Sequence, residues 1–306
     1  MNLQEASAAF QAQLEADGRS PHTRKQYRRH AAAPGRWLAR TRRSTDLAQL
    51  DHRDLAAFVA SPEARCRPDG VDKKATSTNA LRTSLRTLFA YLADSGLLPS
   101  NPAGLLRRAR CCPPPPRSLS GDEQQRLLQV LDADHSVQGR RDRMLVRLLL
   151  LAGARIGSAL ALDVADVDLQ SGQAMLRRAK NDAPAILVLS PTLVVDLGKF
   201  ICDRRDGPLF MTASGARVSV RHIQRRFAAL LTAAKITRKT SLHSLRHSFA
   251  MTLLERTRNI ALVQRALTHR SIASTMAYAK ASTAEVRRAL VGPEDASAAG
   301  SDACAT

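Results

Sequence analysis

The sequence predicts a mainly α-helical protein with one small β-sheet, arranged as two domains. Its length of 306 residues suits about two domains. Four consecutive prolines at positions 113–116 cannot lie inside a helix and should form a stiff, extended connector. Apolar residues recur at helical spacing on both sides of the prolines, and two short strand-like runs interrupt this pattern only in the second half.

These observations divide the chain into four parts. We expect a helical domain over residues 1–110, a proline-rich linker over 111–118 and a second domain over 119–291. Residues 292–306 are small or polar, so we expect this tail to be disordered. An apolar content of 44% is sufficient for a buried core in each domain.

Four helical segments make up the first domain. Ser20 and Pro21 have the residue types of an N-cap and a first helical position. Pro34 and Gly35 should kink or split the helix that begins there. Apolar residues share one face of the last segment, which Gly96 ends: Leu81, Leu85, Leu88, Phe89 and Leu92. The expected segments are residues 3–16, the broken helix after Ser20, residues 47–60 and residues 77–95.

Helices and a hairpin are expected in the second domain. Ser120 and Glu123 have the spacing of a capping box, followed by a helix through Leu131. A strongly apolar helix should cover residues 141–151 and end near Gly153. Two strands are expected over residues 173–179 and 184–189, with residues 180–182 at their turn, and helices from Pro191 onward.

The charge balance indicates a polyanionic partner. The chain has 47 Lys and Arg against 27 Asp and Glu, a net charge of +20. Residues 1–110 carry +9 and the remainder +11, so both domains should face the polyanion, as the jaws of a clamp would. The plainer alternative is a basic protein whose charge only aids solubility.

Nothing in the composition indicates a membrane, a metal or another cofactor. The five cysteines have an odd number and a spacing that fit neither a disulfide framework nor a zinc site, so we expect free thiols in a reducing cytoplasm. The N-terminus lacks the pattern of a signal peptide. The most apolar stretch, residues 144–162, carries Arg147 and Arg155 and is poorly suited to span a bilayer.

Five scattered residues have the types needed to cleave a phosphodiester. Arg155 and Arg246 can bind phosphate oxygens bidentately, and His269 adds a third donor. Tyr278 can attack the phosphorus, but a phenol with a pKa of ~10 needs a base to take its proton. His243 titrates near neutral pH and is the candidate base. This chemistry requires neither a metal nor water as the nucleophile.

Three motifs carry a resemblance to a known family. They are residues 152–162 around Arg155, the His-x-x-Arg motif over residues 243–246, and residues 267–278, which join His269 to Tyr278. In this order they resemble the tyrosine recombinase (phage integrase) family, with the bacterial Xer-like recombinases closest. Residues 77–102 resemble the family's SAM-like core-binding domain, so the resemblance covers about residues 3–290.

The resemblance implies a function in site-specific recombination of double-stranded DNA. Tyr278 would form a 3′-phosphotyrosine, and Lys180 would protonate the departing 5′ oxygen. Attack by a different 5′-hydroxyl would rejoin strands without ATP, in integration, excision or resolution. Two protomers would bind each site and four would form a synapse, with residues 283–290 packed on a neighbour. A second recombinase or an accessory protein could take part.

Several assignments have alternatives. Arg177 or Arg178 could fill the cationic role of Lys180, and His247 is expected to be structural or an outer partner of the site. Two basic clusters could contact DNA or could simply be solvated helix faces: Arg24, Lys25 and Arg28 in the first domain, and Arg221, Arg225 and Arg226 in the second.

The sequence also departs from the family at two positions. Ser158 stands where an acidic residue is usual, three residues after Arg155, and Thr268 stands where glycine is common. The missing acid should affect the rate more than the reaction. Two other functions stay open: a type IB topoisomerase-like relaxer with the same chemistry but no partner exchange, and, because of these two departures, a DNA-binding or architectural protein that has lost activity.

Overall fold

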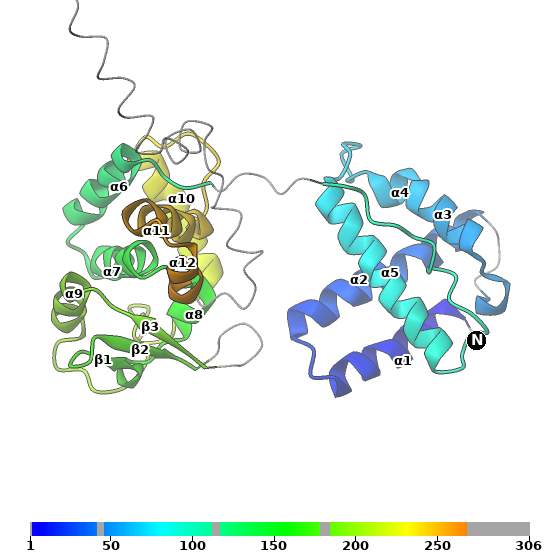
Figure 1. The fold of residues 1–306 in the computed structure, drawn as a ribbon, viewed down its shortest axis with the longest axis horizontal. Helices are drawn as coiled ribbons and strands as arrows, with labels where there is room; N and C mark the ends of the chain where they lie inside the picture. The colour runs from blue at the N-terminus through cyan, green and yellow to red at the C-terminus, as the bar shows by residue number, and fades with distance from the viewer. Residues whose placement is uncertain (1, 42–45, 112–116, 178–183, 268–306) are drawn as a thin grey trace, which may run out of the picture. The chain divides into compact units, whose positions relative to one another are not determined.

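The computed structural model describes residues 2–41, 46–111, 117–177 and 184–267 (Figure 1). It divides into two compact units, Met1–Pro113 and Pro114–Thr306. Helices predominate in both, and the second unit contains a small three-stranded sheet. The predicted fold class is therefore confirmed. No described helix is both long and apolar enough to cross a bilayer.

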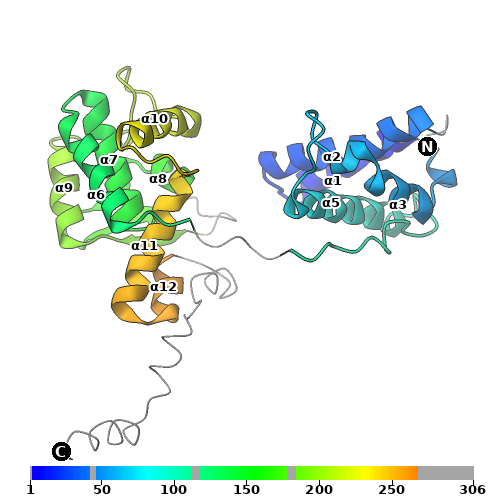
Figure 2. The same ribbon diagram turned by 90° about the horizontal axis from the view of Figure 1, so that it is seen from above.

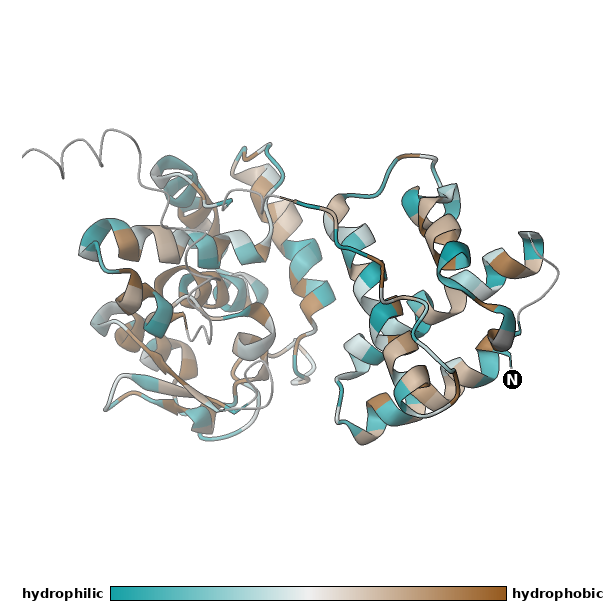
Figure 3. Cartoon of the chain, turned by 45° about the vertical axis from the view of Figure 1, so that its right-hand side comes forward, coloured by the Kyte–Doolittle hydropathy of each residue, from teal (hydrophilic) through white to brown (hydrophobic). Residues whose placement is uncertain are grey.

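Helices α1 to α5 form the N-terminal unit. The apolar face predicted for the last helix is confirmed, because all five of its residues are buried. Figure 3 shows brown, apolar residues and teal, hydrophilic residues within the same helices, as amphipathic helices require. The bounds are α1 (Leu3–Ala16), α2 (Pro21–Thr41), a 3₁₀ turn (Leu47–Gln49), α3 (His52–Ala60), α4 (Pro62–Arg65) and α5 (Ala75–Asp94).

Two details of this unit differ from the expectation. Of the two outcomes expected at Pro34, a split is wrong, because α2 continues through this residue, which is buried. A Cβ at Gly35 would lie 3.3 Å from Cδ2 of Leu3, so the glycine lets α1 approach α2 closely, and this packing offsets the missing hydrogen bond. The segment 47–60 is divided by Asp51, whose side chain caps α3 in a capping box with Asp54.

The C-terminal unit surrounds α7. This helix packs against α6, α8, α9 and α11, and nine of its residues are buried. The predicted capping box of Ser120 and Glu123 is confirmed at α6. Helix α7 begins four residues earlier than expected, after an N-cap at Ser136. The first helices are α6 (Gly121–Ala133), α7 (Val137–Leu151) and α8 (Ile156–Ala161).

An antiparallel sheet and four further helices complete this unit. Strands β2 (Gln173–Leu176) and β3 (Ala185–Val188) confirm the predicted pair, with Ala174 opposite Leu187. The two-residue β1 (Val167–Asp168) was not predicted, since it is too short to show a pattern. The helices are α9 (Pro191–Ile201), α10 (Val220–Ala233), α11 (Leu242–Thr257) and α12 (Ile260–Ala266). Figure 2 shows α11 leading to α12, where Ala250, Val263 and Leu267 form a small separate core.

Candidate active site

The loop between α7 and α8 presents Arg155. Gly153 has a φ of +66°, in the left-handed region that favours glycine. A Cβ here would also lie 2.3 Å from Cδ1 of Phe249 on α11. Both constraints require glycine and fix the path of the loop. Arg155 then occupies the N-cap position of α8, partly buried, and loss of hydrating water lowers its pKa.

Arg246 connects three segments from the first half of α11. Its side chain is 3% exposed. Nη1 donates a hydrogen bond to the carbonyl oxygen of Gly153, and Nη2 donates to the carbonyl oxygen of Leu267, just after α12. Such partners replace the water that a buried cation loses. The guanidinium of Arg246 is therefore held beside the loop that carries Arg155.

Two histidines lie one turn apart on α11 near these arginines. The rings of His243 and His247 meet edge to face, with 4.6 Å between their centroids. His243 remains accessible to solvent, yet partial desolvation, followed by the charges of Arg246 and Arg155, lowers its pKa. Burial, followed by His243 and Arg246, lowers the pKa of His247 to about 4. The lowered pKa of His243 favours the uncharged imidazole, which is the form that can accept a proton.

The structure thus gathers three of the six predicted catalytic residues. Arg155, His243 and Arg246 come from two segments about 90 residues apart in sequence and act electrostatically on one another. The side chains of Lys180, His269, Tyr278 and the nearby Thr268 lie outside the described residues. His247 joins the group, and its spacing of four residues from His243 on one helix was the available sequence signal.

Four of the six predicted DNA contacts are exposed. They are Lys25 and Arg28 on α2, and Arg221 and Arg225 on α10. The other two already have partners within the protein. Arg24 pairs with Glu15, and Arg226 reaches both Asp142 and Asp134. DNA contact by all six residues remains a prediction. The structure supports it better for the four exposed residues, whose side chains are accessible to a ligand.

A buried ion network behind α10 explains the position of Arg226. Arg141 and Asp142 are 4% and 3% exposed, and Nε of Arg141 donates to Oδ1 of Asp142 over 2.9 Å. Nε of Arg226 donates to the other oxygen of Asp142 over 2.8 Å. This network joins α7 to α10 and was not predicted. In the part of the chain that the structure describes, no group of three or more His, Cys, Asp or Glu side chains could hold a metal ion.

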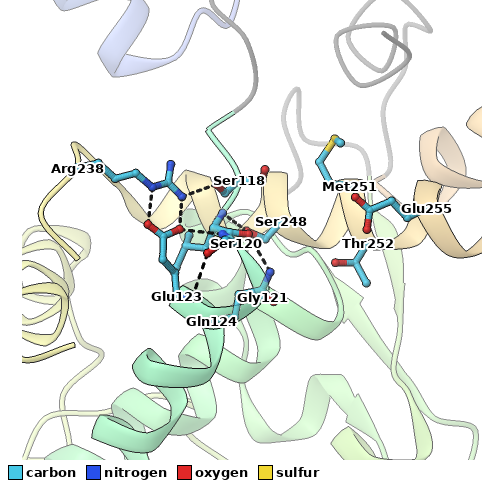
Figure 4. A pocket seen from close by; sticks show the side chains of 11 residues that line it. Ser118, Ser120, Gly121, Glu123, Gln124, Arg238, Ser248, Met251, Thr252 and Glu255 are labelled. Carbon is cyan, nitrogen blue, oxygen red and sulfur yellow. Dashed lines mark hydrogen bonds and ion pairs between the residues drawn. The ribbon is translucent and has the colours of Figure 1, made fainter. Parts of the chain in front are cut away.

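A polar pocket lies at the start of the C-terminal unit (Figure 4). Arg238 donates from Nε to Oε1 of Glu123 over 2.6 Å and also bonds the carbonyl oxygen of Ser118. The hydrogen bond with Arg238 is the main cause that lowers the pKa of Glu123 to about 2. Oγ of Ser248 accepts from the backbone N–H of Leu119 over 2.7 Å. These bonds fix the beginning of the unit against α11.

The helical N-terminal unit, followed by a unit that gathers arginines and histidines around Arg155, is the arrangement of a tyrosine recombinase. The chain belongs to the phage integrase family: residues 117–285 match "Phage integrase family" and residues 8–96 match "Phage integrase, N-terminal SAM-like domain".

Among the curated relatives is "Tyrosine recombinase XerC" of Vibrio parahaemolyticus, 31% identical over 267 residues, which covers 85% of this chain and 83% of that protein. "Tyrosine recombinase XerC" of Serratia marcescens is 30% identical over 285 residues, with 90% of each chain covered. The prediction of an Xer-like tyrosine recombinase is confirmed.

Solved structures share the fold at lower identity. XerH site-specific recombinase bound to difH substrate in a pre-cleavage complex has a TM-score of 0.70 at 21% identity, covering 91% of this chain and 83% of that one. A lambda integrase (75–356) dimer bound to a COC′ core site has a TM-score of 0.69 at 19% identity, covering 90% and 97%.

Proposed function

We propose that this recombinase cuts and rejoins duplex DNA at specific sites through a covalent bond between Tyr278 and a 3′ phosphate. The observation that carries this proposal is the convergence of Arg155, His243 and Arg246 in one site. The two guanidinium groups bind the non-bridging oxygens of the scissile phosphate and stabilise the charge that develops there.

The proton balance assigns a role to each remaining group. His243 takes the phenolic proton of Tyr278 as the oxygen attacks phosphorus. The bond from phosphorus to the 5′ oxygen breaks, and Lys180 supplies that oxygen with a proton. His269 donates to the phosphate. A second 5′-hydroxyl then attacks the phosphotyrosine and restores a phosphodiester. These two steps need neither ATP nor a metal.

The same proposal includes the partners and the place of action. Two protomers bind one site and four form the synapse, with residues 283–290 contacting a neighbour. The XerH structure is bound to its difH substrate and the lambda integrase structure is a dimer bound to a core site, which supports this arrangement. A second recombinase or an accessory protein joins where the two halves of a site differ. The work is done in the bacterial cytoplasm, on nucleoid DNA.

The test is formation of a covalent adduct. Nicked duplex fragments from DNA flanking the gene are incubated with protein in EDTA and resolved on a denaturing gel. Wild-type protein should yield a slow-migrating adduct, and Tyr278→Phe should yield none while binding DNA as before. An adduct with Tyr278→Phe would refute the nucleophile. Binding without any adduct across randomised DNA would favour an inactive DNA-binding protein, and relaxation of plasmids by a monomer would favour a topoisomerase.

A further inference from the structure

A buried carboxylate lies at the corner where α8 leads into the sheet (Figure 1). Asp166 ends a 3₁₀ turn (Val164–Asp166) immediately before β1, and its side chain is 2% exposed. Oδ2 accepts a hydrogen bond from the backbone N–H of Asp163 over 2.9 Å, and Oδ1 accepts one from Nε of Arg177. Since a buried carboxylate without a cationic partner would be strongly unfavourable, the ion pair with Arg177 is held firmly.

The same corner is fixed to α8 and to the segment that precedes α10. Arg217 donates from Nη1 to the carbonyl oxygens of Leu160 and Leu162, over 2.7 and 2.9 Å. Its Nη2 pairs with Oδ1 of Asp163. Helix α8 has Arg155 as its N-cap and spans only six residues, about 9 Å. The corner is therefore held at one short, rigid helix from Arg155.

Arg177 stands where β2 leaves the sheet. The last pair of the described ladder is Leu176 with Ala185, and Arg177 is the first residue of the connection to β3. Its side chain is 65% exposed, so the apolar core does not hold it, and the described bond that fixes it goes to Asp166. Lys180 follows by three residues, at most about 11 Å of chain. The ion pair therefore fixes the point from which the chain continues to Lys180.

We propose that Asp166 is a positioning residue for the step in which the 5′ oxygen departs. Its ion pair with Arg177 joins the connection that carries Lys180 to the corner of α8, and so to Arg155. This inference rests on the proposed function, in which Lys180 supplies a proton as the bond from phosphorus to that oxygen breaks. It gives Arg177 a role other than that of an alternative acid, because a guanidinium keeps its proton and is suited to a lasting ion pair.

The departing atom provides the test. In a nicked duplex that forms the adduct, sulfur replaces the bridging 5′ oxygen of the scissile phosphate. The bond from phosphorus to sulfur then breaks to give a thiolate, which, unlike an alkoxide, is stable near neutral pH without a proton. Asp166→Asn should slow adduct formation about 10- to 100-fold on the oxygen substrate and less than about threefold on the sulfur substrate. An equal loss of rate on both substrates would overturn the inference, since a general structural defect does not depend on the departing atom.

Two exposed residues supply the matched variants. Arg177→Gln breaks the pair from its exposed side and should repeat the pattern of Asp166→Asn, while Arg177→Lys keeps a cation for Asp166 and should recover most of the rate. Asp168 lies two residues after Asp166, and its described hydrogen bonds come from Gln170 and Ser171 in the turn before β2. Asp168→Asn should therefore keep the wild-type rate on both substrates. A wild-type rate in Arg177→Gln on the oxygen substrate would contradict the role of the pair.

A double variant shows whether Asp166 acts through Lys180. Lys180→Ala should slow the reaction of the oxygen substrate about 10²–10⁴-fold and should recover on the sulfur substrate. Adding Asp166→Asn to Lys180→Ala should cause no further loss, because two residues that serve one proton transfer do not have additive effects. Losses that multiply in the double variant would overturn positioning through Lys180 and would assign Arg177 an independent part in the reaction.

Limited proteolysis without DNA separates this inference from the proposed function. The ion pair withholds the side chain of Arg177 from trypsin, so Asp166→Asn should accelerate cleavage after Arg177 several-fold. Cleavage after Lys239, which is exposed between α10 and α11, should keep its rate. Failure of the wild type to form an adduct would refute the proposed function, and with it the role in proton transfer, while faster cleavage in Asp166→Asn would still show that the pair fixes the end of β2. Unchanged cleavage after Arg177 would overturn that fixed position whatever the adduct shows.

Discussion

Two arginines of the C-terminal unit are almost equally buried but are held in different ways. Arg141 is 4% exposed and faces the carboxylate of Asp142, which is itself buried. Arg246 is 3% exposed, and its described hydrogen bonds go to the carbonyl oxygens of Gly153 and Leu267. Carbonyl partners orient a guanidinium without neutralising its charge. The first arginine therefore joins two helices through a carboxylate, whereas two backbone carbonyl oxygens hold the second beside the loop of Arg155.

The largest expected effect tests the structural half of this comparison. Asp142→Ala leaves Arg141 as a buried charge without its carboxylate, which should cost roughly 3–5 kcal/mol of stability. Denaturation followed by far-UV circular dichroism measures the loss. Trp37, the only tryptophan, belongs to the N-terminal unit, so its fluorescence should be unchanged. The exposed Asp132, paired with Arg143, supplies the matched control, and Asp132→Ala should cost less than about 1 kcal/mol.

The catalytic half of the comparison rests on Arg246. Arg246→Ala should slow adduct formation by about 10²–10³-fold, because it removes oriented donors to the transition state. Arg246→Lys should recover only part of the rate, since an ammonium group lacks the planar fork that reaches two carbonyls. The measurement is single-turnover adduct formation on nicked DNA. Arg141→Met provides the contrast and should change the rate of folded protein less than threefold. A similar loss of rate in Arg246→Ala and Arg141→Met would show that the two buried arginines do not differ in their role.

A buried histidine of the N-terminal unit shows a third arrangement, in which the group remains uncharged. Nδ1 of His30 lies 2.8 Å from Oγ of Ser84, and burial, followed by the charges of Arg29 and Lys73, lowers its pKa to about 4. The unfolded chain binds this proton near pH 6.5. The contribution of the uncharged His30 to the free energy of unfolding is therefore fully present above pH 6.5. It is lost as the pH falls towards about 4, by at most about 3 kcal/mol.

Trp37 fluorescence measures this pH dependence in the right unit, because the indole packs against Phe58 with 5.9 Å between ring centroids. Denaturation midpoints of the wild type should fall between pH 6.5 and pH 4.5. In His30→Gln, which cannot titrate, the fall in the denaturation midpoint over this pH range should disappear. An unchanged slope in His30→Gln would assign the effect to other groups.

Local rules predicted the elements whose causes are local. The apolar stripe of α5 and the capping box at Ser120 depend on residues within one helix, and both are confirmed. Pro34 shows where such rules fail, because the close approach of Leu3 to Gly35 keeps α2 continuous. Packing between helices overrode a correct local preference there.

The candidate site shows the same division. The motifs predicted which residues would meet in one site, and Arg155, His243 and Arg246 do lie together. They could not predict that Arg246 binds two carbonyl oxygens, or that Arg226 reaches Asp142, 84 residues away. Hydrogen bonds between residues so far apart in sequence depend on how α7, α10 and α11 pack. A short sequence motif contains no information about this packing. The hydrogen bonds of the Asn79 side chain to the backbone of Ala109, 30 residues away, were missed for the same reason.

The smallest expected effect concerns Ser158, which lies beside Arg155 in sequence. Ser158 lies three residues after Arg155, in the first turn of α8, and is 8% exposed. Ser158→Asp places a carboxylate near the guanidinium and at the positive end of the helix, a gain of about 0.3–1 kcal/mol. If this gain orients Arg155 for the phosphate, adduct formation should accelerate about two- to fivefold. Ser158→Asn has nearly the same shape without the charge and should leave the rate unchanged. A slower Ser158→Asp would show that a carboxylate at this position hinders Arg155.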